Sequence, residues 1–179
     1  RGYKISYVSS KDRDFLPIFR KKCVVIENGV AQNSFQKKNT PALINRLVFV
    51  GNLDYAPNRQ AVDFISQYLC PALPNFQFYI IGDTTKNFSR DYDEQHNLFF
   101  TGYIEDLPVI ASSFSTSGIA CSPGVHYVAA ESVDEFVGAI TKLTMATAYL
   151  QRKNLAQNAR QLISQKYNWD SVVKKYVEL

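Results

Sequence analysis

The stretch NRLVFVGNLD, from Asn45 to Asp54, decides how the rest of the chain is interpreted. Leu47 to Val50 is a short run of β-formers without alternation, which is typical of a strand covered on both faces in a parallel sheet. Gly51 follows at once, and the turn residues after it lead into a helical pattern. In α/β folds, ligands bind outside the carboxyl end of such a strand, near the N-terminus of the helix.

Strands and helices alternate on both sides of this stretch. Three predicted strands run directly into glycine, at Val50-Gly51, Ile81-Gly82 and Thr101-Gly102. This alternation predicts an α/β fold with a Rossmann-like, doubly wound parallel sheet. Strands are expected over 4–8, 23–26, 47–50, 76–81, 98–101, 109–111 and 125–128. Helices are expected over 11–19, 58–69, 132–143 and 155–165, and a linker over 31–44. A last short helix is expected to carry Val172, Val173, Tyr176 and Val177.

Two capping patterns fix where helices begin. Ser9-x-x-Asp12 and Ser132-x-x-Glu135 each place a hydroxyl where it can accept from a free backbone N–H of a first helical turn. Trp169, in the YNWD sequence near the end, is expected to anchor the terminal segment to the core.

Composition limits the classes of function. The chain has 179 residues, of which 46% are hydrophobic, so it can bury a core. Its formal charge of +4 is too small to indicate nucleic-acid binding. The two local basic clusters, Arg20-Lys21-Lys22 and Lys37-Lys38, are either solvated surface or contacts with anionic lipid or phosphate.

The cysteines and the hydropathy indicate a cytoplasmic protein. The three cysteines, Cys23, Cys70 and Cys121, are far apart in the sequence and form no CxxC motif. This pattern is typical of reduced cysteines that pack in the interior. No apolar run approaches the roughly 18 residues of a membrane span, and no signal peptide is visible. The chain opens on Arg-Gly without a starting Met, so we expect it to be a piece of a longer protein.

The connection after the strand at 98–101 is too short. That strand leads through Tyr103 and Ile104 to Leu107, and Pro108 begins the next strand pattern at once. Two parallel strands need a crossover of about a dozen residues or more. Either the two strands form an antiparallel hairpin, or residues are absent between about Leu107 and Pro108. The sequence here lacks the residues of a tight hairpin turn, which favours absent residues.

A succession of blocks carries a resemblance to a known family. In order they are VVIENGV, LVFVGNLDYAPNRQAVDFI, FYIIGD, FFTGYIEDL, PVIASS, GVHYVAAESVDEFVGAI and YNWDSVV. This order resembles the retaining glycosyltransferases of family 4, which have the GT-B fold. The resemblance implies that residues 31–179 are the C-terminal, nucleotide-sugar-binding domain, and that residues 1–30 are the end of the N-terminal acceptor domain with the interdomain linker.

The resemblance also implies what is missing. In that family the segment between GYIEDL and PVIAS carries a strand, a glycine-rich loop with a basic residue, and a helix with two glutamates. None of these groups is present here, so the expected catalytic residues are absent and the chain by itself should be a poor catalyst or none.

Five residues are implied to bind the donor. Gly51 and Asn52 would approach its phosphate or sugar through backbone N–H groups, although an ordinary strand-to-helix turn would explain them too. Gly82 would lie on the floor of the cleft. Tyr103 and Ile104 would meet the nucleotide base, or would simply pack at a strand end.

The partners implied are a nucleotide-sugar, a carbohydrate or lipid-linked acceptor, and the N-terminal domain of the parent protein. Neither metal nor other cofactor is expected, because a helix dipole and basic groups offset the diphosphate charge in this fold. The expected location is the cytoplasm, with peripheral association at the inner face of the membrane.

Three other sequence patterns are weaker candidates for a functional site. Asp91-Tyr92-Asp93 imitates an Asp-x-Asp metal motif but lies in a polar stretch away from any strand end. His96 and His126 lack ligand partners at metal spacing. The hydroxyl-rich stretch from Ser112 to Ser117 lacks the Gly-x-Ser-x-Gly pattern of a serine nucleophile.

Three other classes of function are alternatives to a transferase. The first is a non-catalytic Rossmann-like binding or scaffold module. The second, a receiver domain using Asp54 or Asp83, lacks the acidic pair that such a domain needs. A dinucleotide-binding dehydrogenase is disfavoured because GNLDYAP lacks Gly-x-Gly-x-x-Gly.

Overall fold

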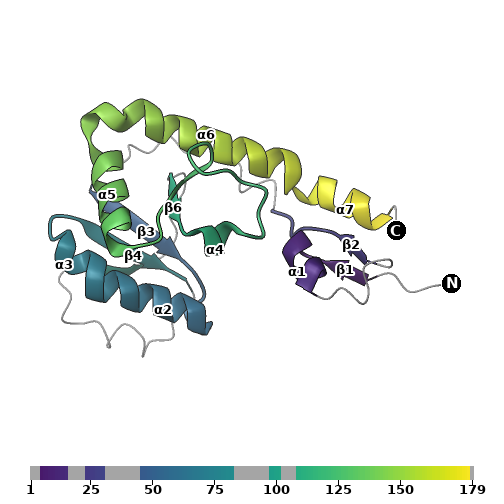
Figure 1. Cartoon of the computed structure of the whole chain (residues 1–179), viewed down its shortest axis with the longest axis horizontal. Coiled ribbons are helices and arrows are strands. Elements are labelled where there is room, and N and C mark those ends of the chain that lie inside the picture. Colours follow the sequence, from purple (N-terminus) through teal and green to yellow (C-terminus); the bar gives the residue numbers. More distant parts are fainter. Residues whose placement is uncertain (1–4, 16–22, 31–44, 83–96, 102–107, 178–179) are drawn as a thin grey trace. The chain divides into compact units, whose positions relative to one another are not determined.

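The computed structural model describes residues 5–15, 23–30, 45–82, 97–101 and 108–177 (Figure 1). These residues belong to two units that are each compact. One unit is built from Arg1–Lys37, Leu107–Glu131 and Tyr149–Leu179, and the other from Lys38–Asp106 and Ser132–Ala148.

The second unit is organised around a three-stranded parallel sheet. Its strands are β3 (Arg46–Val50), β4 (Gln77–Ile81) and β5 (Leu98–Thr101), in the order β3-β4-β5. Val48 is level with Tyr79, and Tyr79 with Phe99, so these three side chains share one face of the sheet.

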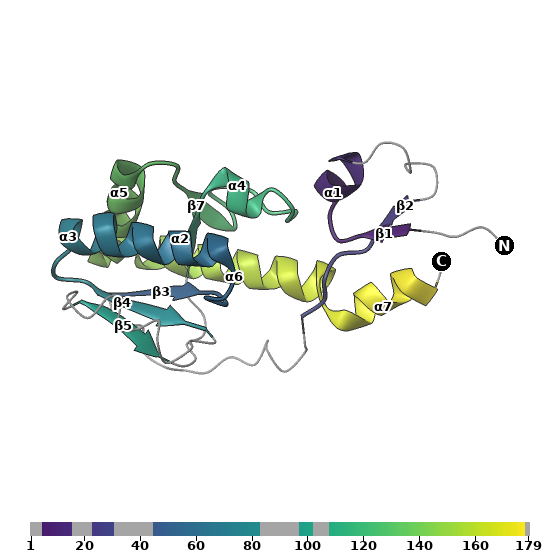
Figure 2. The ribbon, with the colours of Figure 1, turned by 90° about the horizontal axis from the view of Figure 1, so that it is seen from below.

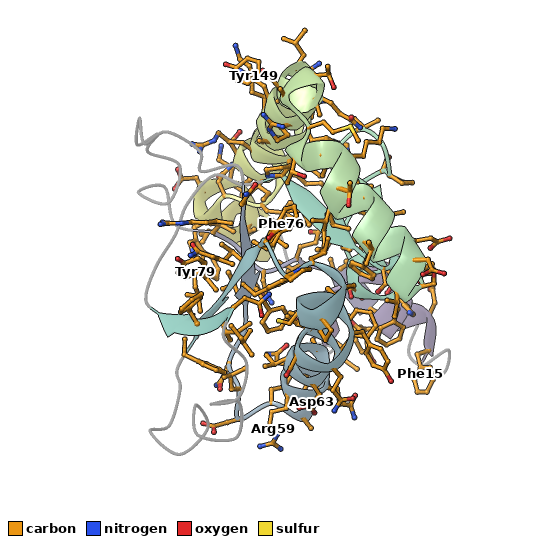
Figure 3. All side chains as sticks on the ribbon, turned by 90° about the vertical axis from the view of Figure 1, so that its left-hand side faces the viewer. Phe15, Arg59, Asp63, Phe76, Tyr79 and Tyr149 are labelled. Atoms are coloured by element: carbon orange, nitrogen blue, oxygen red, sulfur yellow. The ribbon has the colours of Figure 1, made fainter. Side chains whose placement is uncertain are left out.

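One face of this sheet is covered by a helix. α2 (Ala56–Phe64) continues as the π-helical turn η3 (Ile65–Leu69) and the short α3 (Cys70–Ala72), and it lies along the sheet in Figure 2. Val62 of α2 and Ile80 of β4 are fully buried there, and each apolar side chain of this size contributes about 1.5–3 kcal/mol when buried. Tyr79 lies on the side of the sheet away from α2 (Figure 3).

α5 (Val133–Thr144) completes the unit beside η3. The ring centroids of Phe64 and Phe136 lie 5.7 Å apart in an edge-to-face arrangement, which joins α2 to α5. The N-terminus of α5 has the predicted capping box, since Ser132 Oγ accepts from Glu135 N–H and the Glu135 carboxylate accepts from Ser132 N–H. The short 3-10 turn η5 (Ala146–Ala148) follows α5.

The first unit contains two further pairs of parallel strands. β1 (Ile5–Tyr7) pairs with β2 (Cys23–Val25), and α1 (Ser10–Phe15) lies between them in sequence. β6 (Val109–Ala111) pairs with β7 (Tyr127–Ala129). The remaining helices of this unit are α4 (Ser113–Thr116), α6 (Tyr149–Lys166) and α7 (Trp169–Val177).

The C-terminal segment of this unit is hydrogen-bonded to, and packs against, the residues that follow β2. Val30 N–H donates to the carbonyl of Tyr167 at 2.6 Å. The ring of Trp169 lies so close to Gly29 that a Cβ on Gly29 would be 2.4 Å from Trp169 Cδ2. Trp169 thus packs on Gly29 while about half of its side chain stays exposed, and the buried residues of the terminal segment are Tyr167 and Val172. The predicted anchoring of Trp169 in the core is therefore only partly confirmed.

Glu27 adds an ionic contact between the same two segments. Its carboxylate accepts from Lys175 Nζ and lies 4.0 Å from Lys166 Nζ. Burial raises the pKa of Glu27, but the hydrogen bond from Lys175, a backbone hydrogen bond and the two lysine charges together bring it below its ordinary value of 4.5.

All strand pairs in the described part of the chain are parallel, so the predicted α/β fold class is confirmed. β5 pairs with β4 and β6 with β7, and the described residues contain no β5–β6 hairpin. The connection itself, residues 102–107, lies outside the described residues. The absence of chain between Leu107 and Pro108 therefore stays a prediction, as does the predicted domain boundary at residue 30.

Several predicted boundaries were wrong. α2 begins at Ala56 and not at Asn58, because Pro57 is compatible with a first helical turn. The predicted loop after β6 contains α4, whose first turn is capped by the hydroxyl of Ser112. β7 begins two residues later than expected, after a turn in which Gly124 has φ 76°. α6 begins at Tyr149, six residues before Leu155. The last predicted helix is α7, which contains Val172, Val173, Tyr176 and Val177 as expected.

The structure supports the interpretation of Cys70 as a packing residue. Cys70 is the first residue of α3, its side chain is buried, and burial raises the pKa of its thiol to about 11. The thiol is therefore protonated at neutral pH and is a poor nucleophile.

The Glu27 contact yields a prediction about pH. Because the pKa of Glu27 is lowered by folding, its contribution to stability is present above the ordinary pKa and is lost as the pH falls through the folded value. Glu27→Gln should lower the free energy of unfolding by about 0.5–1 kcal/mol at neutral pH, with the difference lost as the pH falls through the folded pKa of Glu27. Urea denaturation at neutral pH and over a series of acidic pH values measures this effect.

Lys175→Gln provides the control in a double-mutant cycle. The double variant should be little less stable than either single variant, because each substitution removes the same contact. Additive losses, or equal stability of Glu27→Gln and the wild type at neutral pH, would contradict a stabilising ion pair.

Candidate functional site

The candidate site lies where β3 and β4 end side by side. Gly51 N–H donates to the carbonyl of Ile81 at 2.9 Å, so the parallel ladder extends one residue beyond β3. Gly51, Asn52 and Gly82 therefore lie together at the carboxyl end of the sheet. This is the edge at which open α/β sheets bind ligands.

Gly82 allows the two chain segments to approach closely. A Cβ on Gly82 would lie 1.9 Å from the carbonyl oxygen of Gly51. No side chain can be accommodated at that distance, so only glycine fits without moving the backbone. The need for glycine at this position thus has a structural cause within the fold, whether or not a ligand binds.

Gly51 is enclosed by the turn that follows it. A Cβ here would lie 2.8 Å from Cγ of Asn58 and 3.1 Å from Cε1 of Phe49. Asn58 Nδ2 in turn donates to the carbonyl of Asn52 at 2.8 Å. The amide of Asn58 thus occupies the space that a side chain at residue 51 would need.

Asn52 shapes the path from β3 into α2. Its side-chain Oδ1 accepts from Asp54 N–H at 2.8 Å, which forms an Asx turn. Its carbonyl accepts from Tyr55 N–H at 3.2 Å. The side-chain oxygen is therefore engaged in the turn, while Leu53 beside it is buried and anchors the turn to the core.

The N-terminus of α2 faces this turn without a side-chain cap. The N-cap residue is Tyr55, which makes no capping hydrogen bond, and Pro57 in the first turn has no N–H to donate. The positive end of a helix dipole favours a negatively charged group. The exposed carboxylate of Asp54 lies in the same turn, so a bound anion would have to be compatible with it.

Two of the five predicted donor-binding residues cannot be compared with this site. Tyr103 and Ile104 lie outside the described residues. The structure brings the other three together, and their role toward a ligand stays a prediction. Sequence reasoning missed Asn58, whose amide closes the turn. The only signal for it was the general preference of asparagine for turns.

The hydroxyl-rich stretch after β6 is explained by local hydrogen bonds. Ser112 Oγ accepts from Ser115 N–H at 3.2 Å, and Thr116 Oγ1 lies 3.1 Å from the hydroxyl of Tyr127. The carboxylate of Glu131 accepts from Ser113 N–H at 2.7 Å, and this hydrogen bond lowers the pKa of Glu131. These contacts give the stretch a structural role at the start of α4.

Only one of the metal and histidine candidates, His126, lies in the part of the chain that the structure describes. His126 Nδ1 accepts from Ser122 N–H at 3.0 Å, which stabilises the turn before β7. Asp91, Asp93 and His96 lie outside the described residues. Within the part of the chain that the structure describes, no group of three or more His, Cys, Asp or Glu side chains is arranged to hold a metal ion.

Comparisons with known proteins identify the fold. No family model matches the sequence, and no curated protein sequence matches it. Among solved structures, a glycosyltransferase from Rickettsia africae superposes with a TM-score of 0.72 at 16% identity, covering 98% of this chain and 62% of that one. Sucrose-phosphate synthase from Thermosynechococcus elongatus gives 0.74 at 14% identity, covering 99% and 57%.

Another solved neighbour contains a nucleotide-sugar. Anabaena HepE, in complex with UDP-glucose, superposes with a TM-score of 0.72 at 15% identity, covering 98% of this chain and 62% of that one. The three likenesses define an α/β fold shared with GT-B glycosyltransferases. The chain spans less than two thirds of the length of each of these neighbours.

The Gly51–Gly82 approach yields a stability prediction. Gly82→Ala should destabilise the fold by more than about 3 kcal/mol, because the added Cβ would overlap the Gly51 carbonyl and force the strands apart. Thermal and urea denaturation followed by circular dichroism would measure the loss.

Gly138→Ala on α5 is the matched control. A Cβ there would meet nothing within 4 Å, and alanine favours a helix over glycine by about 1 kcal/mol, so this variant should be more stable than the wild type. Equal stability of Gly82→Ala and the wild type would show that the strand ends are not held at the observed distance.

Proposed function

We propose that this chain is the nucleotide-sugar-binding part of a retaining glycosyltransferase of family 4. The parent protein would transfer a hexosyl group from a nucleotide-sugar to a carbohydrate or lipid-linked acceptor in polysaccharide or glycolipid assembly. The observation that carries the proposal is the superposition of 98% of this chain on a structure that contains UDP-glucose.

The geometry at the carboxyl end of the sheet supports this proposal. Gly51, Asn52 and Gly82 lie together next to the uncapped N-terminus of α2, and such a helix end favours an anionic group. A diphosphate would be oriented by backbone N–H groups of the turn and by the helix dipole, without a metal ion.

The connection between β5 and β6 limits what this chain can do by itself. Residues 102–108 alone join Thr101 to Val109, which is too short for a strand and its flanking helices. The resemblance to family 4 assigns the basic residue and the two glutamates of the donor site to such a segment. We therefore propose that the chain is an incomplete catalytic unit.

The acceptor and the location follow from the class of enzyme proposed. Within the described residues, none of the helices combines the length and apolarity needed to cross a membrane. A cytoplasmic enzyme associated peripherally with the inner membrane face would meet both a soluble nucleotide-sugar and a lipid-linked acceptor.

An NMR titration tests the proposed ligand class. On adding UDP-glucose, the amide resonances of Gly51, Asn52 and Gly82 should shift with weak, millimolar affinity, while that of Gly138 on α5 should not. UDP, GDP and ADP titrated in the same way identify the base preferred.

Two outcomes would contradict the proposal. At about 10 mM nucleotide, a site with a Kd of about 1 mM would be nearly saturated. If none of the nucleotides shifts the three amide resonances up to that concentration, the proposed ligand class is wrong. Sub-micromolar binding measured by calorimetry would show that the site is complete, contrary to the expectation for a chain lacking the central segment.

The short connection also favours a second candidate, a non-catalytic binding or scaffold module. If Leu107 and Pro108 are joined in the natural protein, the catalytic segment is absent altogether. Mass spectrometry of the natural protein decides between the two. A product that runs through this junction without extra residues supports the module, and additional mass between β5 and β6 supports the transferase.

A further inference from the structure

Asn28 and Gly29 form the only Asn-Gly pair in the sequence, and they lie in the segment that follows β2. Both residues are outside any helix or strand, and the isolated bridge between Val30 and Asn168 begins at the next residue. Asparagine is a chemically labile residue, and a following glycine, which has no Cβ, gives the backbone the least hindered approach to its side-chain amide. The pair is therefore a candidate for a spontaneous reaction of the main chain.

Both reacting groups are accessible in the structure. Asn28 is exposed to solvent. Among the described residues, neither its side chain nor the N–H of Gly29 has a hydrogen-bond partner, whereas the next N–H, that of Val30, donates to the carbonyl of Tyr167. A backbone nitrogen that is fixed in a hydrogen bond cannot turn toward a neighbouring side chain. The nitrogen of Gly29 is free of that restraint.

Packing requires the glycine of this pair. A Cβ on Gly29 would lie 2.4 Å from Cδ2 and 2.7 Å from Cε3 of Trp169, so the indole ring occupies the space that a side chain at residue 29 would need. A larger residue at this position would lose the contact with Trp169. The contact that holds the C-terminal segment therefore also keeps a reactive dipeptide in the chain.

We propose that Asn28 is a site of succinimide formation, and that opening of the succinimide to isoaspartate releases α7 from the residues after β2. The deprotonated nitrogen of Gly29 attacks the side-chain carbonyl carbon of Asn28. A C–N bond forms, the bond to the amide nitrogen breaks, and that nitrogen takes up a proton and leaves as ammonia. Water then adds to one of the two carbonyl carbons of the cyclic imide and opens it.

The two directions of ring opening give different products. One gives aspartate in an unaltered main chain. The other gives isoaspartate, in which the main chain passes through the former side-chain carbon and is longer by an extra carbon atom. Only the second product changes the spacing between β2 and the residues that follow it.

Two contacts of the C-terminal segment depend on that spacing. The N–H of Val30 donates to the carbonyl of Tyr167 at 2.6 Å, and the ring of Trp169 packs on Gly29. The extra carbon displaces both residues 29 and 30 from these partners. Glu27 precedes the insertion, so its ion pair with Lys175 is retained while the other two contacts are lost.

Peptide mapping by mass spectrometry tests the reaction on the folded chain, incubated at neutral and at mildly alkaline pH. Asn28 should convert to isoaspartate and aspartate faster than the other asparagines, and faster at the higher pH, because more of the Gly29 nitrogen is deprotonated. Asn75 is the internal control. It is also exposed and outside any helix or strand, but it precedes Phe76, whose N–H donates to the carbonyl of Leu73.

The fluorescence of Trp169, the single tryptophan of the chain, tests the release of α7. The isoaspartate form should emit at longer wavelength than the fresh protein. Its Tm should be lower by about 2–4 °C, as expected for the loss of about one hydrogen bond in a chain of this size. Asn28→Gln, whose longer side chain would have to close a larger ring, should show neither change after the same incubation.

Asn28→Asp is the matched control for charge. It carries the carboxylate of the product without the extra carbon, so it should keep the emission and the Tm of the fresh wild type. Circular dichroism shows that each variant is folded.

Three outcomes would overturn the proposal. In the first, Asn28 stays intact in the folded chain but reacts in urea, because native contacts block the attack. In the second, Asn28 and Asn75 react equally fast. In the third, the isoaspartate form keeps the emission and Tm of the fresh protein, or Asn28→Asp shows the same change, so that the extra carbon is not what releases α7.

Discussion

The close approach of Gly82 to the carbonyl of Gly51 is the constraint on which the second unit depends. It fixes where β3 and β4 end relative to each other, because the two strands can pass at this distance only if residue 82 carries no side chain. The register of the two strands, the turn through Asn52 and the starting point of α2 all follow from that alignment. The candidate ligand site is the outer surface of the same contact, so its shape is set by strand packing before any ligand is present.

This constraint explains which parts of the fold and site the sequence could reveal. Continuous apolar runs ending in glycine indicated the parallel strands, since both signals report burial and close backbone approach directly. The sequence also placed Gly51 and Gly82 at the site, but it suggested ligand approach as their cause, whereas the structure supplies a packing cause. The distinction rests on a contact between residues 31 positions apart, which no local pattern encodes.

Other features were hidden because they depend on the same kind of distant partner. The amide of Asn58 fills the space beside Gly51 only after α2 has folded back over the sheet. α4 forms in a stretch of weak helix formers because Ser112 and Glu131 satisfy its first N–H groups. The Glu131 contact joins residues 18 positions apart with β7 between them, and propensity within the loop gave no indication of it.

The short connection between β5 and β6 links the functional and the architectural arguments. A doubly wound sheet needs one more strand between the halves of its order, and the family resemblance assigns the donor-binding charges to the segment containing that strand. We propose that this segment is absent from the chain, and its absence would have two physical consequences of different kinds. The proposed donor site would lack the cations that neutralise a diphosphate, and the side of β3 away from β4 would lack the strand that pairs with it in a doubly wound sheet. The first consequence concerns catalysis and can be tolerated by a folded protein. The second concerns strand pairing, which is the more demanding requirement because buried backbone groups without hydrogen-bond partners are costly.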